Sequence, residues 1–239
     1  MSHDTEERNL ELTPRIVEVR DRRPNRTVSF DLIAIKNRFE NNLSSIKAQF
    51  TLVEKLKSEG DLQYKDILRS QIVFLESAFD FYMHEITKYG MLHIFQGLWM
   101  MTPKYNNFNI RLGDVSEALQ HTENEGWFLD IVNDTYAEDT FMSSESVIGQ
   151  LNLIGVCWQD VAKEAFYERG SETPTGDKFK VVLNSLFRRR NKIAHQADCL
   201  HETGDKLDIE RETVEEYIAN IEKIVNAISQ EMQKKNNSE

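Results

Sequence analysis

The spacing of hydrophobic residues along the 239-residue chain predicts long helices from residue 29 onward. Apolar residues recur every three or four positions, which is the period of one face of an α-helix. Residues 29–60 predict a first helix that has Ser29 as its N-cap and ends at Gly60. Residues 61–90 predict a second helix whose middle is apolar on more than one face, as expected for the central helix of a bundle.

The second half of the chain shows the same period. Residues 144–168 predict one helix, and a loop over residues 170–176 separates it from a helix that Asp177 caps and that runs into residues 190–200. A charged loop over residues 201–208 precedes a last helix. The apolar stripe of this helix consists of Val214, Tyr217, Ile218, Ile221, Ile224, Val225, Ile228 and Met232.

Two regions are less regular. Residues 1–28 are polar and charged and predict an N-terminal arm, although the alternation at residues 16–19 is also typical of a short strand. Residues 90–142 predict only short helices, at 91–101, 114–121 and 126–136. The pattern as a whole predicts an all-α bundle with an extra N-terminal helix and an irregular middle insertion.

Composition supports this fold class and narrows the cellular setting. The chain has 4 Pro and 10 Gly, fewer breakers than many short strands would need. No apolar run reaches the roughly 18 to 20 residues of a membrane helix, and the first residues lack the features of a signal peptide. Cys157 and Cys199 have no spacing typical of a disulfide framework. We therefore expect a reducing, cytoplasmic location.

Charge and missing motifs exclude several function classes. A net charge of −11 argues against a protein that coats nucleic acid non-specifically, but it permits one local basic site for RNA. The chain contains no phosphate-binding Gly-x-x-x-x-Gly-Lys loop, no His-Glu-x-x-His and no serine nucleophile elbow. An NTPase, a zinc protease and a common serine hydrolase are therefore disfavoured.

One segment carries candidate chemistry: residues 187–195 read Phe-Arg-Arg-Arg-Asn-Lys-Ile-Ala-His. RNA cleavage without a metal needs a base for the ribose 2′-hydroxyl proton and a cation for charge on the phosphate. Histidine suits the first task because its pKa lies near the working pH. Arginine suits the second because its planar guanidinium matches phosphate oxygens and stays charged. Arg190, Asn191 and His195 are therefore the candidate catalytic residues.

The string Arg190-Asn191-x-x-Ala194-His195 resembles the motif of the HEPN superfamily, in which His follows Arg after four to six residues and a polar residue follows the Arg. The resemblance extends more loosely to residues 70–89 and 213–230. It implies a HEPN-like domain over residues 29–239, with the motif-bearing part at about 144–230. It also implies a metal-independent, cofactor-free endoribonuclease that acts as a toxin or effector in bacterial defence or a toxin–antitoxin pair. RNA is then the substrate, and an antitoxin or regulatory protein is a possible partner.

Helix geometry constrains how this site is built. At about 100° per residue, Asn191 and His195 share a face, whereas Arg190 lies roughly 140° away from His195. Either the helix distorts or the site is shared between two chains. The resemblance implies the second arrangement, a homodimer in which two motifs meet at a two-fold axis and form one cleft.

Three neighbouring arginines satisfy the loose spacing to His195, and Asn191 favours Arg190 as the catalytic one. Arg188, Arg189 and Lys192 are then assigned to the RNA backbone. Some toxins of the superfamily carry a tyrosine two residues after the histidine, where a partner modifies them. Ala197 occupies that position here, which puts this route of silencing in doubt.

Several alternatives stay open. The arginine run is also typical of a solvated helix C-terminus. The alternative function is a catalytically silent HEPN module that binds RNA, nucleotide or a protein partner, and a third is a purely structural dimerisation unit. Glu76 is either an auxiliary acid of the site or a buried partner in the core. A further set resembles metal ligands without a defined geometry: His195, Asp198, Cys199 and His201.

Overall fold

The computed structural model describes residues 31–120, 126–170 and 172–238, and the predicted arm at 1–28 lies outside them. The predicted all-α class is confirmed. Within these ranges the only extended pairing is an isolated bridge between Cys199 and Lys206. The helices are α1 (Leu32–Ala48), α2 (Phe50–Ser58), α3 (Tyr64–Phe95), α4 (Pro103–Asn106), α5 (Leu112–Gln120), α6 (Trp127–Tyr136), α7 (Ser144–Leu153), α8 (Trp158–Phe166), α9 (Thr175–Gln196) and α10 (Arg211–Ser238).

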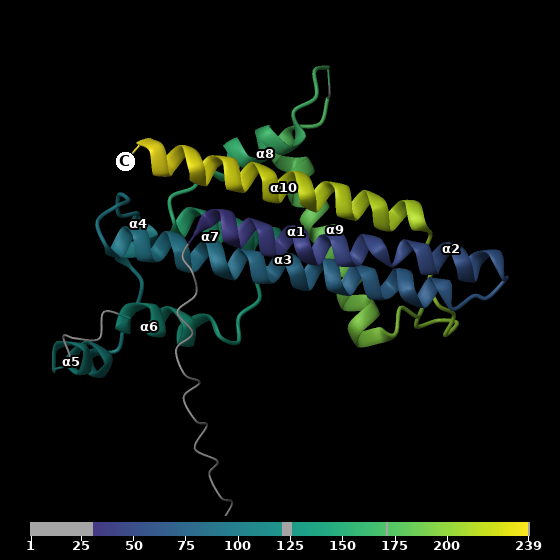
Figure 1. Cartoon of the computed structure of the whole chain (residues 1–239), viewed down its shortest axis with the longest axis horizontal. Helices are drawn as coiled ribbons and strands as arrows, with labels where there is room; N and C mark the ends of the chain where they lie inside the picture. The colour runs from purple at the N-terminus through teal and green to yellow at the C-terminus, as the bar shows by residue number, and fades with distance from the viewer. Residues whose placement is uncertain (1–30, 121–125, 171, 239) are drawn as a thin grey trace, which may run out of the picture.

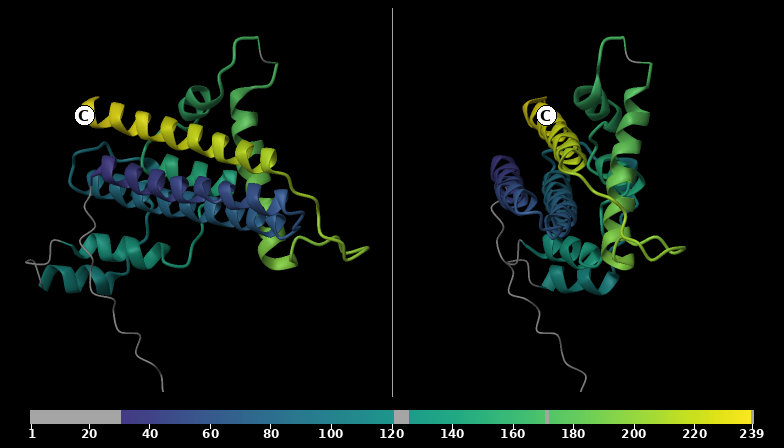
Figure 2. Two further views of the ribbon diagram at one scale, coloured as in Figure 1. Left: turned by 45° about the vertical axis from the view of Figure 1, so that its right-hand side comes forward. Right: turned by 90° about the vertical axis from the view of Figure 1, so that its right-hand side faces the viewer.

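Helix α3 is the centre of the bundle. α1 and α10 run along it, whereas α9 runs at a steep angle to these helices and packs on α3 and α10 (Figures 1 and 2). α2, α6 and α7 also contact α3, and α8 packs on α9 and α10. The short helices α4, α5 and α6 of the predicted insertion gather at one end of α3 (Figure 1). The end of α9 that carries the Arg-Asn-x-x-Ala-His string lies toward the other end (Figure 2).

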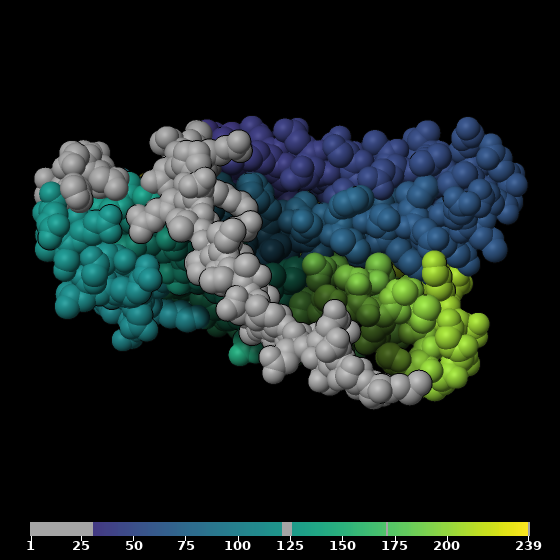
Figure 3. All heavy atoms as spheres, turned by 90° about the horizontal axis from the view of Figure 1, so that it is seen from below, coloured from purple at the N-terminus to yellow at the C-terminus, as the bar shows by residue number. Residues whose placement is uncertain are grey.

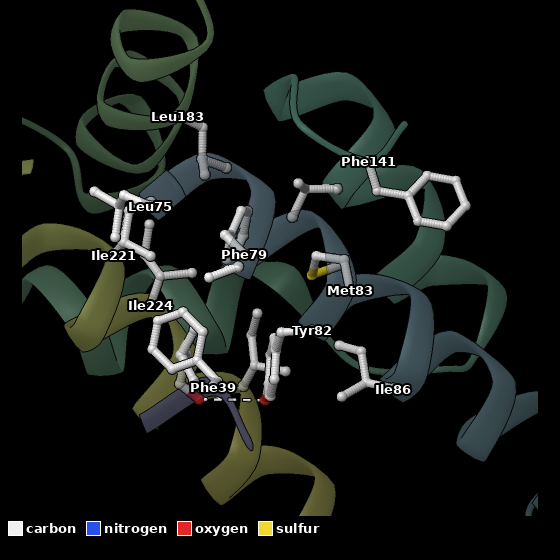
Figure 4. Packing of buried hydrophobic residues seen from close by; sticks show 14 of the residues in the cluster. Phe39, Leu75, Phe79, Tyr82, Met83, Ile86, Phe141, Leu183, Ile221 and Ile224 are labelled. Atoms are coloured by element: carbon white, nitrogen blue, oxygen red, sulfur yellow. Dashed lines mark hydrogen bonds between the residues drawn. The ribbon is translucent and has the colours of Figure 1, made fainter. Parts of the chain in front are cut away.

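The core forms around the middle of α3, as its many-sided apolar pattern predicts. α3 contributes fully buried side chains on several faces, because neighbouring helices cover it on most sides. Figure 4 shows how residues of α1, α9 and α10 converge on it. The labelled members of this cluster are Phe39, Leu75, Phe79, Tyr82, Met83, Ile86, Phe141, Leu183, Ile221 and Ile224. Such interdigitated packing makes each core position sensitive to added volume.

Two of the predicted helices are each interrupted once. The first breaks at Gln49 and yields α1 and α2. Asp31 caps α1 by accepting a hydrogen bond of 3.0 Å from the Ile33 amide, whereas the predicted cap Ser29 lies outside the described residues. The predicted helix over residues 144–168 breaks after Leu153, where Gly155 adopts the left-handed conformation with φ of 72°.

The apolar pattern concealed this second break because the residues that span it are themselves buried. Ile154 and Val156 both pack into the core although the chain turns between them. The turn is closed by a 2.9 Å hydrogen bond from the Val156 amide to the Leu151 carbonyl. Glycine at position 155 suits such a helix end, since it takes a positive φ without steric cost.

Gly90 lies inside α3, although the pattern predicts a helix end there. A Cβ atom at this position would lie 2.6 Å from the Ile154 Cβ and 3.0 Å from the Trp99 ring. The glycine therefore allows the turn between α7 and α8 to approach the α3 backbone closely. This contact fixes the turn against the central helix.

We predict that Gly90→Ala lowers the free energy of unfolding by about 1–3 kcal/mol, because the added methyl group overpacks this contact. Gly113→Ala is the matched control, since Gly113 lies in α5 and a Cβ there would have no atom within 4 Å. It should leave stability unchanged or raise it by up to about 1 kcal/mol. Urea unfolding of both variants checks this, and equal effects would contradict the proposed close approach.

Candidate active site

Helix α9 carries the Arg-Asn-x-x-Ala-His string in its last two turns. Its earlier turns are anchored by Phe179, Leu183 and Leu186, which are buried in the core. The opposite face is exposed at Val181, Ser185, Arg188 and His195. The string therefore lies where a core-packed helix meets solvent.

Arg190 extends from α9 toward α3. Its Nε atom lies 2.7 Å from Oε2 of Glu76, and its Nη1 donates a 3.0 Å hydrogen bond to Oδ1 of Asn191. The Arg190 side chain is 26% exposed, whereas that of Glu76 is 2% exposed. Asn191 thus lies beside the guanidinium, in a place where it orients Arg190.

The contact of Glu76 with Arg190 is only partly satisfied. The Nε–H bond is not aligned with the carboxylate, so neither Glu76 oxygen has a hydrogen bond, and Nε has none either. Burial raises the pKa of Glu76 to about 8; the Arg190 charge opposes this shift and the nearby Asp80 adds to it. At neutral pH Glu76 is therefore largely protonated, and the positive charge of Arg190 is not cancelled.

His195 lies on the exposed face, one turn after Asn191. Arg190 contacts α3 while His195 faces solvent, as the helical period requires. A single chain therefore does not bring these two side chains together. The sequence could predict this separation because it depends only on position along one helix.

Arg189 holds the loop that follows α9. Its Nη2 donates to Oδ2 of Asp198 at 2.7 Å and to the Asp208 carbonyl at 3.1 Å. Arg69 of α3 donates from Nε to the same Asp198 oxygen at 2.8 Å and from Nη2 to the Leu207 carbonyl at 2.6 Å. Asp198 is fully buried, so two guanidinium groups share one carboxylate inside the protein.

The backbone at Asp198 is constrained as well. Ala197 and Asp198 both adopt left-handed conformations, with φ of 49° and 62°, which are uncommon for residues other than glycine. The Asp198 amide donates to the Lys192 carbonyl at 3.0 Å, and its carbonyl accepts from the Leu207 amide at 2.7 Å. These bonds and the two arginines hold the end of α9 three residues after His195.

The other predicted residues occupy the accessible part of the helix. Arg188 is exposed and Lys192 is half-buried, so both are placed to meet a ligand. Arg189 is engaged by Asp198, and its predicted contact with RNA stays a prediction. The sequence pattern indicated Asp198 only as a candidate metal ligand. In the described part of the chain no group of three or more His, Cys, Asp or Glu side chains could hold a metal ion.

Arg69 was missed because nothing in its local sequence distinguishes it from a surface arginine of α3. The sequence does contain an indication of the role of Asp198, because an acid just after a basic helix end is well placed to pair with a cation. Its partner on α3, however, lies 129 positions away in the chain.

An α-helical bundle whose penultimate long helix ends in Arg190-Asn191-x-x-Ala194-His195 is the arrangement expected of a HEPN domain. The family model described as RiboL-PSP-HEPN matches residues 37–234, so the chain belongs to this family. Neither the curated proteins nor the solved structures gave a significant match. Among the described helices, none combines the length and the apolar character needed to cross a membrane.

We predict that Glu76→Gln changes how stability depends on pH. The unfolded chain releases the Glu76 proton near its ordinary pKa of 4.5, whereas the folded protein retains it up to about pH 8. The folded state binds more protons in this window, so the free energy of unfolding falls as pH rises through it. Without that titration, Glu76→Gln should lose less stability than wild type between pH 4.5 and pH 9, by an amount on the order of a few kcal/mol.

Urea unfolding between pH 4.5 and pH 9 measures this difference. Glu216→Gln, at an exposed position of α10, is the control and should follow the wild-type pH dependence. The reading of Glu76 as a buried neutral acid is refuted if Glu76→Gln loses as much stability toward pH 9 as wild type does.

Proposed function

We propose that this protein is a metal-independent endoribonuclease of the HEPN type. The observation that carries the proposal is the placement of Arg190, Asn191 and His195 at the accessible end of α9 in a RiboL-PSP-HEPN domain. Both side-chain types that metal-free RNA cleavage requires are present there. Arg190 is in addition oriented by Asn191.

In the proposed reaction, His195 accepts the proton of a ribose 2′-hydroxyl, and the oxygen attacks the adjacent phosphorus. Arg190 stabilises the negative charge that builds up on the phosphate oxygens. The bond from phosphorus to the 5′-oxygen breaks, and that oxygen leaves after taking a proton from water. His195 then releases the proton that it accepted to the solvent. The products are a 2′,3′-cyclic phosphate and a 5′-hydroxyl end.

RNA binding is assigned to the cations that surround His195. Arg188 shares its face of α9, and Lys192 lies in the turn between them, so both can meet backbone phosphates. Arg189 carries the same assignment, with part of its guanidinium already committed to Asp198. We expect it to contribute through the shape of the helix end as well as through charge.

A homodimer would complete the site. Arg190 and His195 of one chain lie on different faces of α9, so a two-fold axis beside this helix would bring the Arg190 of one copy toward the His195 of the other. The exposed face of α9 also carries Val181, which is 66% exposed and apolar. Covering Val181 would favour such an interface.

The cellular role follows from the family resemblance alone. We propose a cytoplasmic toxin or effector of bacterial defence or of a toxin–antitoxin pair, held in check by an antitoxin or regulatory protein. The second candidate is a catalytically silent module that binds RNA, nucleotide or protein. The partial burial of Arg190 against Glu76 favours it, because a catalytic cation needs access to the phosphate.

We predict that His195→Ala and Arg190→Ala each reduce RNA cleavage by at least about 100-fold, because general-base catalysis and charge stabilisation each contribute on that scale. His201→Ala is the matched control, since His201 is an exposed histidine in the following loop, and it should cleave like wild type. Cleavage of labelled RNA, with circular dichroism to confirm folding, provides the measurement.

The same assay identifies the mechanism. Cleavage should persist in excess chelator and leave cyclic phosphate ends. A strict requirement for a divalent ion, 3′-hydroxyl products, or unchanged activity in both variants would overturn the assignment. A folded wild-type protein that cuts no RNA would favour the silent module.

We predict that mixing Arg190→Ala with His195→Ala chains restores part of the activity. A composite cleft built from one Arg and one His of opposite chains is intact in the mixed dimer, although each variant alone lacks one of them. Sedimentation should show a dimer, with a buried area above roughly 1,000 Å² if it is lasting. A monomer at micromolar concentration that still cleaves RNA would contradict the shared site.

A further inference from the structure

A pocket of about 320 Å³ lies between α3 and the end of α9. We call it the seam pocket, and it is lined by Asp66, Arg69, Ser70, Val73, Phe74, Ile193, Ala197 and Lys206. Figure 3 shows the side of the molecule on which the end of α9 and its following loop lie against α3. Its volume falls at the lower end of the range for small-molecule sites.

The seam pocket lies on the same faces of α3 and α9 as the contact between Glu76 and Arg190. On α9, Arg190, Ile193 and Ala197 have the spacing of one helical face. On α3, Arg69 and Glu76 are seven residues apart and so also share a face, the one that meets α9. The Arg190 contact and the seam pocket therefore lie on the same faces of α3 and α9.

The lining suits a flat aromatic ligand. Val73, Ile193 and Ala197 supply apolar walls, and Phe74 is 51% exposed although it belongs to the central helix. An accessible aromatic ring beside apolar side chains is a platform on which nucleobases stack. Such stacking tolerates any base, because every base has a π-face.

We call the contact between α3 and the end of α9, which includes the seam pocket and the Arg190 contact, the seam. The charge of the seam suits a polyanion, even though the whole chain carries a net charge of −11. Four cationic side chains lie along it, against the three carboxylates of Asp66, Asp80 and Asp198. Glu76, which lies near Asp80, is largely protonated at neutral pH. The neighbouring pair of Lys65 with Asp208 adds no net charge. The four cations are Arg69, Arg189, Arg190 and Lys206.

We propose that the seam pocket binds one nucleobase of a single-stranded RNA, stacked on Phe74, with an adjacent phosphate at Lys206. This inference rests on the proposed function and names a subsite of the same cleft. Lys206 is half exposed and lies 2.7 Å from Asp66, so its ammonium stands at the rim of the pocket. The base would leave the stack of its own strand to enter.

Two polar groups at the edge determine which base fits best. The Asp66 carboxylate is ionised at neutral pH, because its hydrogen bond with Lys206 lowers its pKa. The Ser70 hydroxyl donates to the Asp66 carbonyl at 2.9 Å and leaves its oxygen as an acceptor. Both groups accept hydrogen bonds, so they favour a base with an exocyclic amino group over uracil.

The test uses the His195→Ala protein, which we expect to bind RNA without cutting it, and short single-stranded RNAs that each lack one base. Removing the base that occupies the pocket should weaken binding by roughly 5- to 100-fold, the scale of one stacking contact. Phe74→Ala should weaken binding of the intact RNA by a similar factor. With Phe74→Ala, removal of the same base should then have little further effect, because the two changes delete one contact.

Phe81→Ala is the matched control, since Phe81 is 45% exposed on the same helix but lies outside the pocket. It should bind intact and abasic RNAs like the parent protein. Replacing the pocket base by uracil should weaken binding in the parent protein but not in Phe74→Ala.

Several results would overturn the subsite. Phe74→Ala could bind like the parent protein, Phe81→Ala could lose as much affinity, or Phe74→Ala could convert a dimer to monomers, which would assign the pocket to a contact between copies. A different result would overturn the proposed function and leave the subsite intact: the His195→Ala protein binds RNA with the predicted pattern, but wild type cuts no RNA. If no RNA binds, both proposals fail.

Discussion

The shared contact of Arg69 and Arg189 with the Asp198 carboxylate is the constraint on which the candidate site depends. Asp198 is fully buried, and such a charge is tolerated only when it is paired and hydrogen-bonded. One arginine comes from α3 and the other from α9, so a single carboxylate ties the two helices together. It also draws the loop after α9 back onto the bundle, which sets where the helix ends and where His195 lies.

A second buried carboxylate on the same seam behaves differently. Glu76 has one arginine partner and no aligned hydrogen bond, so desolvation dominates and the acid stays largely neutral at pH 7. The guanidinium of Arg190 is held near α3 without losing its charge. The two arginines at Asp198 therefore stabilise the end of α9, whereas the contact at Glu76 leaves the Arg190 cation available beside the seam pocket.

Much of the helical architecture was predictable from the sequence. The apolar period located the main helices, because burial of one helical face imposes that period on any such segment. It failed at Gln49 and Gly155, where buried residues continue across a break and the pattern contains no interruption. It also placed a helix end at Gly90, where the glycine instead makes room for Ile154. These differences concern packing between segments far apart in the chain.

The sequence by itself determined which functional groups α9 carries and the angles at which they project around the helix. The order Arg190, Asn191, His195 sets which side chains share a face, since the helical period is a local property of the backbone. Only the tertiary structure decided that Glu76 meets Arg190, that Arg69 and Arg189 share Asp198, and that a pocket opens beside Ile193. These contacts depend on how α9 crosses α3, and that crossing results from the packing of the whole core rather than from any one segment.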